Sequence, residues 1–330
     1  MQQESSQCLR SDSVLVLGGS GFIGTRLVSR LMKKDVPTRV GDLKQSEAFP
    51  RIWTSCDVRD GKTLRTLFSE AKAVINLAAE HRDDVRPVSR YHETNVEGAS
   101  EVCLAARDTG ISKIIFASSA AVYGFHPLPV DEGGPFLPFN PYGETKLKAE
   151  GIYQTWAHED PSRTLVIIRP TVVFGEGNRG NVYNLLHQVA TGKFMMVGPG
   201  TNRKSMAYVG NLVDFLIHTL SLDPGIHIFN YVDGPDMNMN TLVDHVAGCL
   251  GKSKGKYLRI PKPVALAGGY LLDGIARVTG RKFPISAVRV QKFCENTQFR
   301  ADRLAQSGFK APCSLSEGLL RTIEFEFPRK

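Results

Sequence analysis

A short apolar run that ends in a glycine-rich turn and continues into an amphipathic helix constrains this chain most. Residues 13–19 (SVLVLGG) are apolar and β-branched, which predicts a buried strand, and residues 21–32 place Phe, Ile, Leu and Val at helical spacing. Glycines that lack Cβ atoms allow a tight turn and a close approach of pyrophosphate, which the free N–H groups at the helix start attract. The segment therefore predicts a dinucleotide-binding turn. Its expected cofactor contacts are Gly18, Gly21, Phe22, Ile23 and Gly24.

An acidic residue at the end of the next expected strand indicates which dinucleotide binds. Asp42 closes the strand that we expect over residues 38–43. A carboxylate at this place accepts hydrogen bonds from both ribose hydroxyls and repels a 2′-phosphate, so it favours NAD over NADP. Arg39 and Lys44 stand close to Asp42 in the sequence and keep NADP open as the alternative.

Strand-like and helix-like segments alternate through the first half of the chain. After the glycine turn, strands are expected over 38–43, 73–79, 113–119 and 164–170, and helices over 62–71, 95–110 and 141–160. Such alternation predicts an α/β fold, a Rossmann-type doubly wound parallel sheet with helices on both faces.

Three regions follow from this pattern. Residues 1–12 form a polar tail, residues 13–170 an NAD-binding Rossmann domain, and residues 171–330 a smaller C-terminal α/β substrate-binding region. The strand expected over 226–233 returns to the sheet, so the two larger regions partly interleave. Ser314 and Glu317 form a capping box that predicts a last helix.

Composition excludes several classes of protein. The 330 residues are 42% hydrophobic with a formal net charge of +8, which suits a folded protein with an anionic ligand. Because no run of five Lys or Arg occurs, nucleic acid is not an expected partner. The six cysteines show no C-x-x-C spacing and the polar first residues resemble no signal peptide, so we expect a cytoplasmic protein.

Two further absences are expected from the residue pattern. No histidine pair or carboxylate cluster has the spacing of metal ligands, so we expect no metal. The apolar stretch over 263–272 is too short to span a membrane, and we expect it to form a core helix.

A tyrosine, a lysine and a serine form the candidate catalytic group. Tyr142 and Lys146 are four residues apart near the start of the helix over 141–160, so both lie on one helical face. A lysine ammonium near the phenol lowers the pKa of the phenol, and the tyrosine can then act as a base toward a sugar or alcohol hydroxyl. Ser118 and Ser119 follow the preceding strand, at the edge where open α/β sheets bind ligands.

In their order along the chain, these motifs resemble the extended short-chain dehydrogenase/reductase family, especially its nucleotide-sugar epimerase and dehydratase branch. The resemblance extends over nearly the whole chain. Its landmarks are LGGSGFIG (17–24), CDVRD (56–60), NLAAEHRDD (76–84), NVEGA (95–99), FASSAAVYG (116–124), PYGETK (141–146), RPTVVFG (169–175) and GFKAPCSLSEGL (308–319).

The resemblance implies a role for several residues. Tyr142 would be the catalytic acid/base and Lys146 its partner and ribose ligand. Ser119, which directly precedes AAVYG, would align the substrate, in preference to Ser118. Asn95 would be a structural strut. The cofactor contacts that the resemblance adds are Asp57, Val58, Leu77, Ala78, Ala79, Tyr142, Lys146 and Pro170.

The residues beside Ser119 exclude one of the reactions known in this branch of the family. Dehydratases of this branch carry Thr-Asp-Glu where this chain has Ser118, Ser119 and Ala120, so 4,6-dehydration is not expected. We favour an NAD-dependent 4-epimerase of the UDP-hexose or UDP-N-acetylhexosamine type, which works through a 4-keto sugar. A nucleotide-4-keto-sugar reductase that uses NAD(P)H needs the same residues and stays the alternative. A non-catalytic NAD-binding sensor and a steroid-type dehydrogenase are weaker hypotheses.

The substrate contacts are expected from the second region. GNRGNVYNLL (177–186) resembles the family's loop beside the diphosphate and makes Asn181 a candidate ligand. Lys204 falls where many epimerases have a phosphate-binding arginine, and Arg289 is a third candidate. The helical faces at 95–106 and 144–156 are expected to form a homodimer interface, and the expected pathway is polysaccharide biosynthesis.

Overall fold

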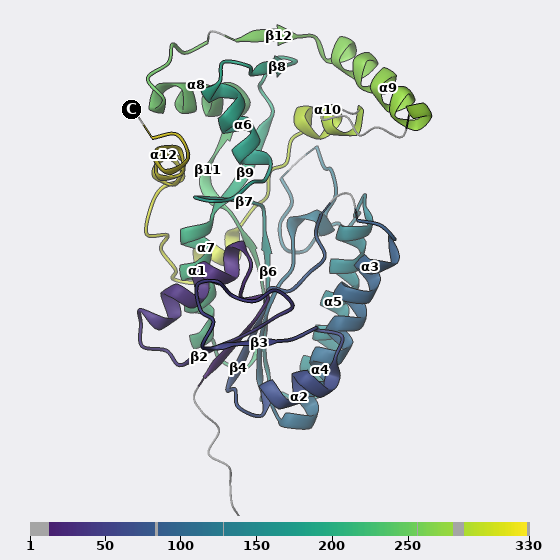
Figure 1. The fold of residues 1–330 in the computed structure, drawn as a ribbon, viewed down its shortest axis with the longest axis vertical. Coiled ribbons are helices and arrows are strands. Elements are labelled where there is room, and N and C mark those ends of the chain that lie inside the picture. Colours follow the sequence, from purple (N-terminus) through teal and green to yellow (C-terminus); the bar gives the residue numbers. More distant parts are fainter. Residues whose placement is uncertain (1–12, 83–84, 128, 256, 280–286, 329–330) are drawn as a thin grey trace, which may run out of the picture.

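A computed structural model describes residues 13–82, 85–127, 129–255, 257–279 and 287–328 of the chain. A large parallel sheet and its helices form the lower part of the molecule in Figure 1, and shorter strands and helices from the C-terminal half form the upper part. The polar tail expected over 1–12 lies outside the described residues.

Seven strands form the large sheet, in the order β10-β6-β5-β4-β1-β2-β3, and every neighbouring pair is parallel. The strands are β1 (Val14–Leu17), β2 (Thr38–Asp42), β3 (Trp53–Ser55), β4 (Ala73–Asn76), β5 (Lys113–Ala117), β6 (Thr164–Pro170) and β10 (Gly225–Tyr231). The strand order reverses between β1 and β4, and such sheets bind ligands at the carboxyl ends of the strands beside this point. The predicted Rossmann-type fold is confirmed.

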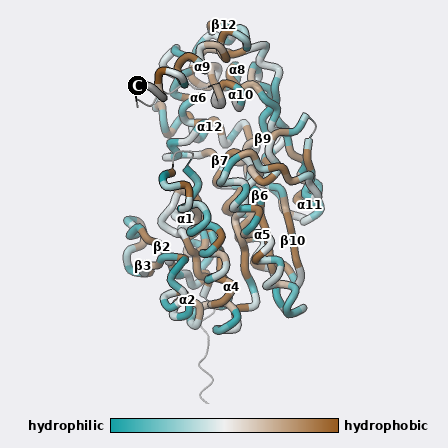
Figure 2. The backbone as a smooth tube through the Cα atoms, turned by 90° about the vertical axis from the view of Figure 1, so that its right-hand side faces the viewer, coloured by the Kyte–Doolittle hydropathy of each residue, from teal (hydrophilic) through white to brown (hydrophobic). Residues whose placement is uncertain are grey.

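Helices cover both faces of this sheet. Figure 1 shows α1 (Phe22–Met32) and α7 (Val209–His218) on one side, and α2 (Gly61–Phe68), α4 (Gly98–Thr109) and α5 (Pro141–His158) on the other. Successive side chains of a strand point to opposite faces, so the buried strand residues divide between two apolar cores, with Val16 in one and Leu17 in the other. In Figure 2 hydrophobic brown stretches run through the sheet near β6 and β10, whereas the edge near β2 and β3 is mostly hydrophilic in colour.

The helix α5 is well defined at its start. The Asn140 side chain accepts a hydrogen bond from the Gly143 backbone N–H at 2.9 Å, and Pro141 occupies the first turn. Both features favour a helix that begins at this point. The buried face of α5 packs on the sheet through Tyr153 and Trp156.

Smaller sheets form the upper part. A three-stranded sheet has the order β11-β9-β7 and a two-stranded sheet pairs β12 with β8. These strands are β7 (Val172–Phe174), β8 (Met195–Val197), β9 (Arg203–Tyr208), β11 (Asp233–Asn238) and β12 (Leu258–Ile260). The remaining helices are α3 (Ser89–His92), α6 (Asn181–Ala190), α8 (Met239–Cys249), α9 (Lys262–Thr279), α10 (Ala287–Cys294), α11 (Asp302–Gln306) and α12 (Leu315–Glu326), with short turns η1 (Glu93–Glu97), η2 (Ala120–Val122) and η3 (Thr219–Ser221).

The chain after residue 170 contributes to both parts. α7 packs against α1, and β10 pairs with β6 along its full length, so both belong to the lower part of the molecule, with the large sheet. α12 begins where the capping box predicts, because the Ser314 hydroxyl accepts a hydrogen bond from the Glu317 backbone N–H at 3.2 Å.

Two expectations differ from the structure. The edge strand β3 was not predicted, because its three residues WTS carry no apolar alternation. The stretch 263–272 is helical within α9, but it is not a core helix, because Val264, Tyr270 and Leu271 are 60%, 67% and 66% exposed. These three side chains face outward, although α9 packs against α10 on its other side.

Candidate active site

The glycine turn joins β1 to α1 in a conformation that needs glycine. Gly18 has a φ of +75°, and a Cβ there would lie 2.7 Å from a backbone nitrogen in the segment after β4. A Cβ on Gly24 would lie 2.6 Å from the Gly19 Cα, so the first turn of α1 sits directly on the loop. Gly21 caps α1 without a side-chain hydrogen bond. The first N–H groups of α1 therefore have no capping side chain and suit a bound anion.

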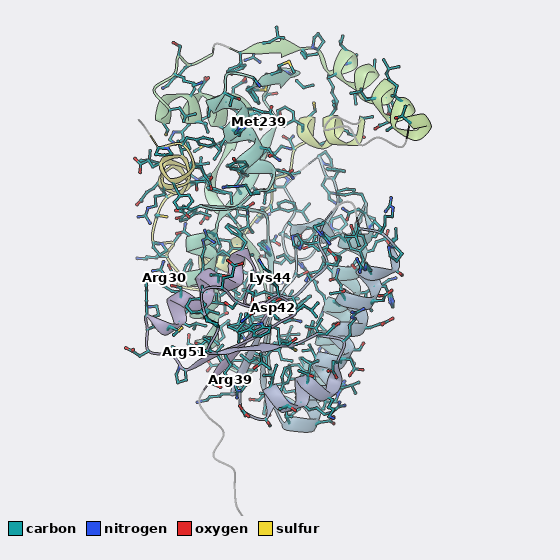
Figure 3. The ribbon with its side chains drawn as sticks, viewed as in Figure 1. Arg30, Arg39, Asp42, Lys44, Arg51 and Met239 are labelled. Carbon is teal, nitrogen blue, oxygen red and sulfur yellow. The ribbon has the colours of Figure 1, made fainter. Side chains whose placement is uncertain are left out.

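Asp42 lies beside this turn at the end of β2. One carboxylate oxygen accepts a hydrogen bond from the Ser20 backbone N–H at 3.0 Å and the other from the Lys44 backbone N–H at 2.9 Å. Each oxygen keeps acceptor capacity for a ribose hydroxyl. Arg39 and Lys44, which kept NADP open, each form an ion pair with a glutamate. Figure 3 shows Asp42 and Lys44 together at one end of the strand, with Arg39 further down.

Two loops at the same sheet edge carry the other expected cofactor residues. Asp57 follows β3, and its carboxylate accepts hydrogen bonds from the Arg59 guanidinium, which holds the pKa of Asp57 below its usual range. Val58 is buried against the start of α4. Leu77, Ala78 and Ala79 follow β4. The Leu77 backbone N–H bonds to the Leu17 carbonyl of β1, and Ala78 abuts Gly18, so the start of this segment lies against the glycine turn. Pro170 ends the buried strand β6.

The structure brings Tyr142, Lys146 and Ser119 together at the carboxyl ends of β5 and β6. The Ser119 hydroxyl accepts a hydrogen bond from the Ala121 backbone N–H at 3.1 Å and hydrogen-bonds to the Tyr142 phenol. Lys146 lies one helical turn after Tyr142 and is only 2% exposed. Its ammonium lies 4.0 Å from the centroid of the Phe116 ring. These contacts join the phenol to the Ser119 hydroxyl and place the Lys146 amino group, one helical turn further along, against Phe116 of β5.

Burial controls the protonation of this group. Desolvation raises the pKa of the Tyr142 phenol, and the hydrogen bond from Ser119 lowers it in part. Desolvation also lowers the pKa of Lys146 to about 7, against the attraction of the Glu150 carboxylate. The expected lowering of the phenol pKa by the lysine therefore does not appear in the protein alone, because burial disfavours the charged form of each group.

Ser118 serves a different purpose from Ser119. Its hydroxyl donates to the Glu150 carboxylate, which also forms two hydrogen bonds with the Arg169 guanidinium, at 2.6 and 2.9 Å. Glu150 and Arg169 are 1% and 2% exposed. The Ser118 hydroxyl is thus committed to a buried ion pair beneath the site, whereas Ser119 stays half-buried and faces Tyr142.

The sequence analysis did not predict the ion pair between Glu150 and Arg169 or the further hydrogen bonds of Arg169. The Arg169 guanidinium also donates to the Tyr123 hydroxyl at 2.6 Å and to the Glu132 carbonyl at 2.9 Å. Two signals were present: Glu150 continues the four-residue spacing of Tyr142 and Lys146, and Arg169 is the one charged residue in the apolar run TLVIIRP.

Asn95 holds the loop after β4 to α5. It lies in the π-helical turn η1, where its side chain accepts a hydrogen bond from the Glu80 backbone N–H at 2.9 Å and donates to the Glu80 carbonyl at 3.0 Å. It also donates to the Thr145 hydroxyl at 3.0 Å. Thr145 is next to Lys146, so these bonds fit a strut that fixes the helix relative to the loop.

The expected substrate residues do not share one contact network in the described part of the chain. Asn181 is an exposed residue in the first turn of α6. The Lys204 ammonium, on β9, donates to the Glu295 carbonyl at 2.5 Å, and burial lowers the pKa of Lys204 to about 8. Arg289 lies on α10, and its side chain is outside the described residues.

The family model described as the NAD dependent epimerase/dehydratase family matches residues 14–230. The chain therefore belongs to the NAD dependent epimerase/dehydratase family, and it is an enzyme of the epimerase/dehydratase class. The predicted family resemblance is confirmed.

Individual relatives indicate the reaction more narrowly than the family model does. The chain is 49% identical over 319 residues to the N-acetyl-alpha-D-glucosaminyl-diphospho-ditrans,octacis-undecaprenol 4-epimerase of Escherichia coli O157:H7, with 96% of each chain covered. It is 27% identical to the UDP-glucose 4-epimerase of Vibrio cholerae, with 94% of each covered. MoeE5, solved in complex with UDP-glucose and NAD, superposes with a TM-score of 0.75 at 26% identity over 95% of this chain and 98% of MoeE5. These relatives support the predicted 4-epimerase.

NAD is the cofactor of this family, and the residues of this chain fit it. The glycine turn has no room for Cβ atoms at Gly18 and Gly24. The Ser20 hydroxyl in the turn is buried and has no hydrogen-bond partner among the described residues. Asp42 lies where ribose hydroxyls need an acceptor. This set of groups suits a pyrophosphate with an unphosphorylated ribose.

Replacing Lys146 with methionine is expected to stabilise the cofactor-free protein and to remove its activity. The folded-state pKa is about 7, whereas an unfolded lysine titrates near 10.4. The unfolded chain therefore binds more protons between these values, and the free energy of unfolding of the wild type rises from pH 7 to pH 10. We expect Lys146→Met to add on the order of 4 kcal/mol at pH 7 and below, and less than about 1 kcal/mol near pH 10.

Urea denaturation across this pH range measures the effect, with Lys148→Met as control, because Lys148 is exposed on the same helix. The control should leave the pH dependence of stability unchanged. A difference between Lys146→Met and the wild type that does not vary with pH would contradict the burial argument.

Proposed function

We propose that this protein inverts C4 of an N-acetylhexosamine that is joined through a diphosphate to a polyprenyl carrier. One observation carries the proposal: the 49% identity to the undecaprenol-linked 4-epimerase extends over 96% of both chains. Identity at this level over nearly the full length of both chains supports the same fold and the same reaction.

The chemistry of the site follows from three side chains. Bound NAD⁺ supplies a reversible hydride acceptor and a positive charge beside the phenol. Tyr142 would take the proton of the C4 hydroxyl as the hydride leaves C4. After the 4-keto sugar has turned over, C4 would regain the hydride on its other face, and Tyr142 would return the proton to the C4 oxygen. Ser119 holds the C4 oxygen and, by its hydrogen bond, favours the phenolate of Tyr142.

Lys146 positions the cofactor and supplies charge. Its buried ammonium would bind the nicotinamide ribose, and these hydrogen bonds would offset the desolvation that now lowers its pKa. Glu150, one turn further along α5, attracts the ammonium and is itself held by Arg169. We propose the cofactor roles given above for the residues of the glycine turn, Asp42, Val58 and the loop after β4.

The substrate is proposed to lie between the two parts of the molecule. Residues 13–170 would hold NAD and residues 171–330 the sugar diphosphate. Asn181, Lys204 and Arg289 are the proposed diphosphate contacts. Burial lowers the pKa of Lys204 to about 8, so Lys204 carries its charge at neutral pH, as a phosphate ligand must.

A UDP-linked N-acetylhexosamine is the second candidate substrate. It is favoured by the similarity to MoeE5, which was solved with UDP-glucose and NAD, and to the Vibrio cholerae UDP-glucose 4-epimerase. Both candidates share the sugar, the diphosphate and the reaction at C4. In either case we propose a cytoplasmic enzyme that acts in the biosynthesis of a surface polysaccharide.

We propose that the protein is a homodimer through the outer surface of the two helices that carry residues 95–106 and 144–156. The apolar faces at 95–106 and 144–156 mostly pack inward, since Val102, Cys103 and Trp156 are fully buried. What remains outward is Leu104 on α4, which is 40% exposed, and the half-buried Ile152 on α5. These adjacent helices offer the outer surface for a second copy.

Exchanging each of the two serines for alanine should separate catalysis from stability. Ser119→Ala is expected to lower kcat by about 10²-fold or more. It should also move the acidic limb of the kcat profile to higher pH, because the Ser119 hydrogen bond lowers the pKa of Tyr142 in the wild type and its removal raises that pKa. Ser118→Ala is expected to cost about 1–3 kcal/mol in the free energy of unfolding and to change kcat little. Kinetics and urea denaturation measure both. Equal kcat for the two variants would refute the assignment of Ser119.

Activity on two carriers tests the substrate. Purified protein without added NAD is given either an N-acetylglucosaminyl polyprenyl diphosphate or UDP-N-acetylglucosamine, and C4 inversion is followed by chromatography of the released sugar. We expect kcat/KM for the lipid-linked sugar to exceed that for the nucleotide by at least about 10²-fold, about 2.7 kcal/mol of transition-state binding. Preference for UDP-N-acetylglucosamine would favour the second candidate, and turnover only of a 4-keto sugar with added NADH would favour the reductase.

Light scattering of the eluted protein tests the dimer. The wild type should show twice the chain mass of 36.3 kDa. Leu104→Arg should lower this mass to that of one chain, because it places a charge in the proposed contact. A wild type that elutes as a single chain at micromolar concentration would exclude the homodimer.

A further inference from the structure

The outward face of α9 is apolar, which reverses the usual pattern of a surface helix. From residue 263 to residue 275 every exposed position carries an apolar or small residue, namely Pro263, Val264, Ala267, Gly268, Tyr270, Leu271, Gly274 and Ile275. The acid of this stretch, Asp273, is half-buried and accepts a hydrogen bond from the Ala287 backbone N–H at 3.0 Å. Surface helices normally turn such a stripe toward the core.

The position of α9 leaves this face open. Figure 1 shows α9 at the outer upper corner of the molecule, away from the large sheet, with α10 beneath it. A shallow groove of about 440 Å³ runs along the helix. Its lining residues are Tyr270, Leu271, Gly274, Ile275 and Thr279. A contiguous apolar surface of this kind marks an interaction site.

The charge around α9 is strongly positive. Residues 251–282 contain eight Lys or Arg and one acid, Asp273, which is a net charge of +7, against +8 for the whole chain. Lys252, Lys254 and Arg259 are exposed in the segment that leads to α9. The basic excess of the protein is therefore concentrated on the segment that carries the open apolar helix.

We propose that α9 and its basic flanks dock the protein on the surface of an anionic lipid bilayer. The apolar face would enter the interface between headgroups and acyl chains, and the lysines and arginines would contact the headgroups. No helix in the described part of the chain is long and apolar enough to cross a bilayer. The proposal deepens the proposed function and rests on it for its purpose, because a polyprenyl carrier resides in the bilayer.

Charge favours a bilayer over a second copy of the chain. A symmetric contact through α9 would bring two segments of net charge +7 against each other. Like charges at such short range repel, whereas anionic headgroups neutralise them.

Vesicle flotation of the full chain tests this docking. The protein is mixed, without substrate, with vesicles of phosphatidylcholine and phosphatidylglycerol in equal parts, or of phosphatidylcholine alone. We expect the wild type to float with the anionic vesicles and to bind the neutral ones at least about tenfold less. The double variant Leu271→Ser with Ile275→Ser should lower the fraction bound to anionic vesicles about tenfold.

The matched control is Phe325→Ser, which removes an equally apolar side chain, 62% exposed, from α12. It should float like the wild type. Turnover of a short-chain, detergent-free diphosphate substrate should stay unchanged in the double variant, which shows that its fold and site are intact. Flotation thus measures docking and turnover measures catalysis, so a negative result in one assay can be told apart from a negative result in the other.

Two outcomes would overturn the proposal. One is equal flotation of the double variant and the wild type on anionic vesicles, or no flotation of the wild type. The other is a wild type that has the mass of two chains in light scattering and an α9 variant that has the mass of one, while Leu104→Arg keeps the mass of two. That result would make a second copy the occupant of this face.

Discussion

The ion pair between Glu150 and Arg169 is the interaction on which the site depends. It joins α5 to β6 in the interior, where neither side chain has water as an alternative partner, and the Ser118 hydroxyl connects it to the loop after β5. Removing one member of such a pair leaves an uncompensated buried charge, which costs about 3–5 kcal/mol. The pair thereby fixes the rotation of α5. Because Tyr142 and Lys146 stand on the same helical row, their direction toward the sheet edge is fixed with it.

Burial at this site opposes the charges that the reaction needs. Desolvation raises the pKa of Tyr142 and lowers that of Lys146, so it shifts both groups toward their uncharged forms. Base catalysis at neutral pH needs the opposite charges. The positive charge and the hydroxyls of a bound dinucleotide would favour the charged form of each group. The acidity of the phenol would then be coupled to the cofactor, and the base would form only in the complex that holds a hydride acceptor.

Sequence reasoning predicted the elements whose physical cause is local. The strand–glycine turn–helix follows from residues 13–32 because the turn needs glycine and the flanks need apolar periodicity, and the serine and tyrosine segments follow from their places beside a strand and a helix start. The edge strand β3 was missed because an exposed edge imposes little pattern on three residues. Glu150 and Arg169 were missed because each satisfies the other across 19 positions, and a single sequence shows no such pairing. The approach of the Lys204 ammonium to the Glu295 carbonyl is equally non-local.

The prediction that residues 263–272 of α9 form a core helix was wrong for a different reason, and that reason bears on the surface of the protein. An apolar stretch of helical spacing was expected to face a core, since in water exposed apolar surface is unfavourable. That inference assumes that the whole surface of the protein meets water. From residue 263 to residue 275 the exposed positions of α9 are apolar or small, and the flanking sequence adds an excess of positive charge. Each of these features is unfavourable in water and favourable at an anionic interface. A substrate with a polyprenyl tail imposes the same condition on its enzyme, because the sugar diphosphate can reach the Tyr142 phenol only if the protein approaches the bilayer that holds the tail.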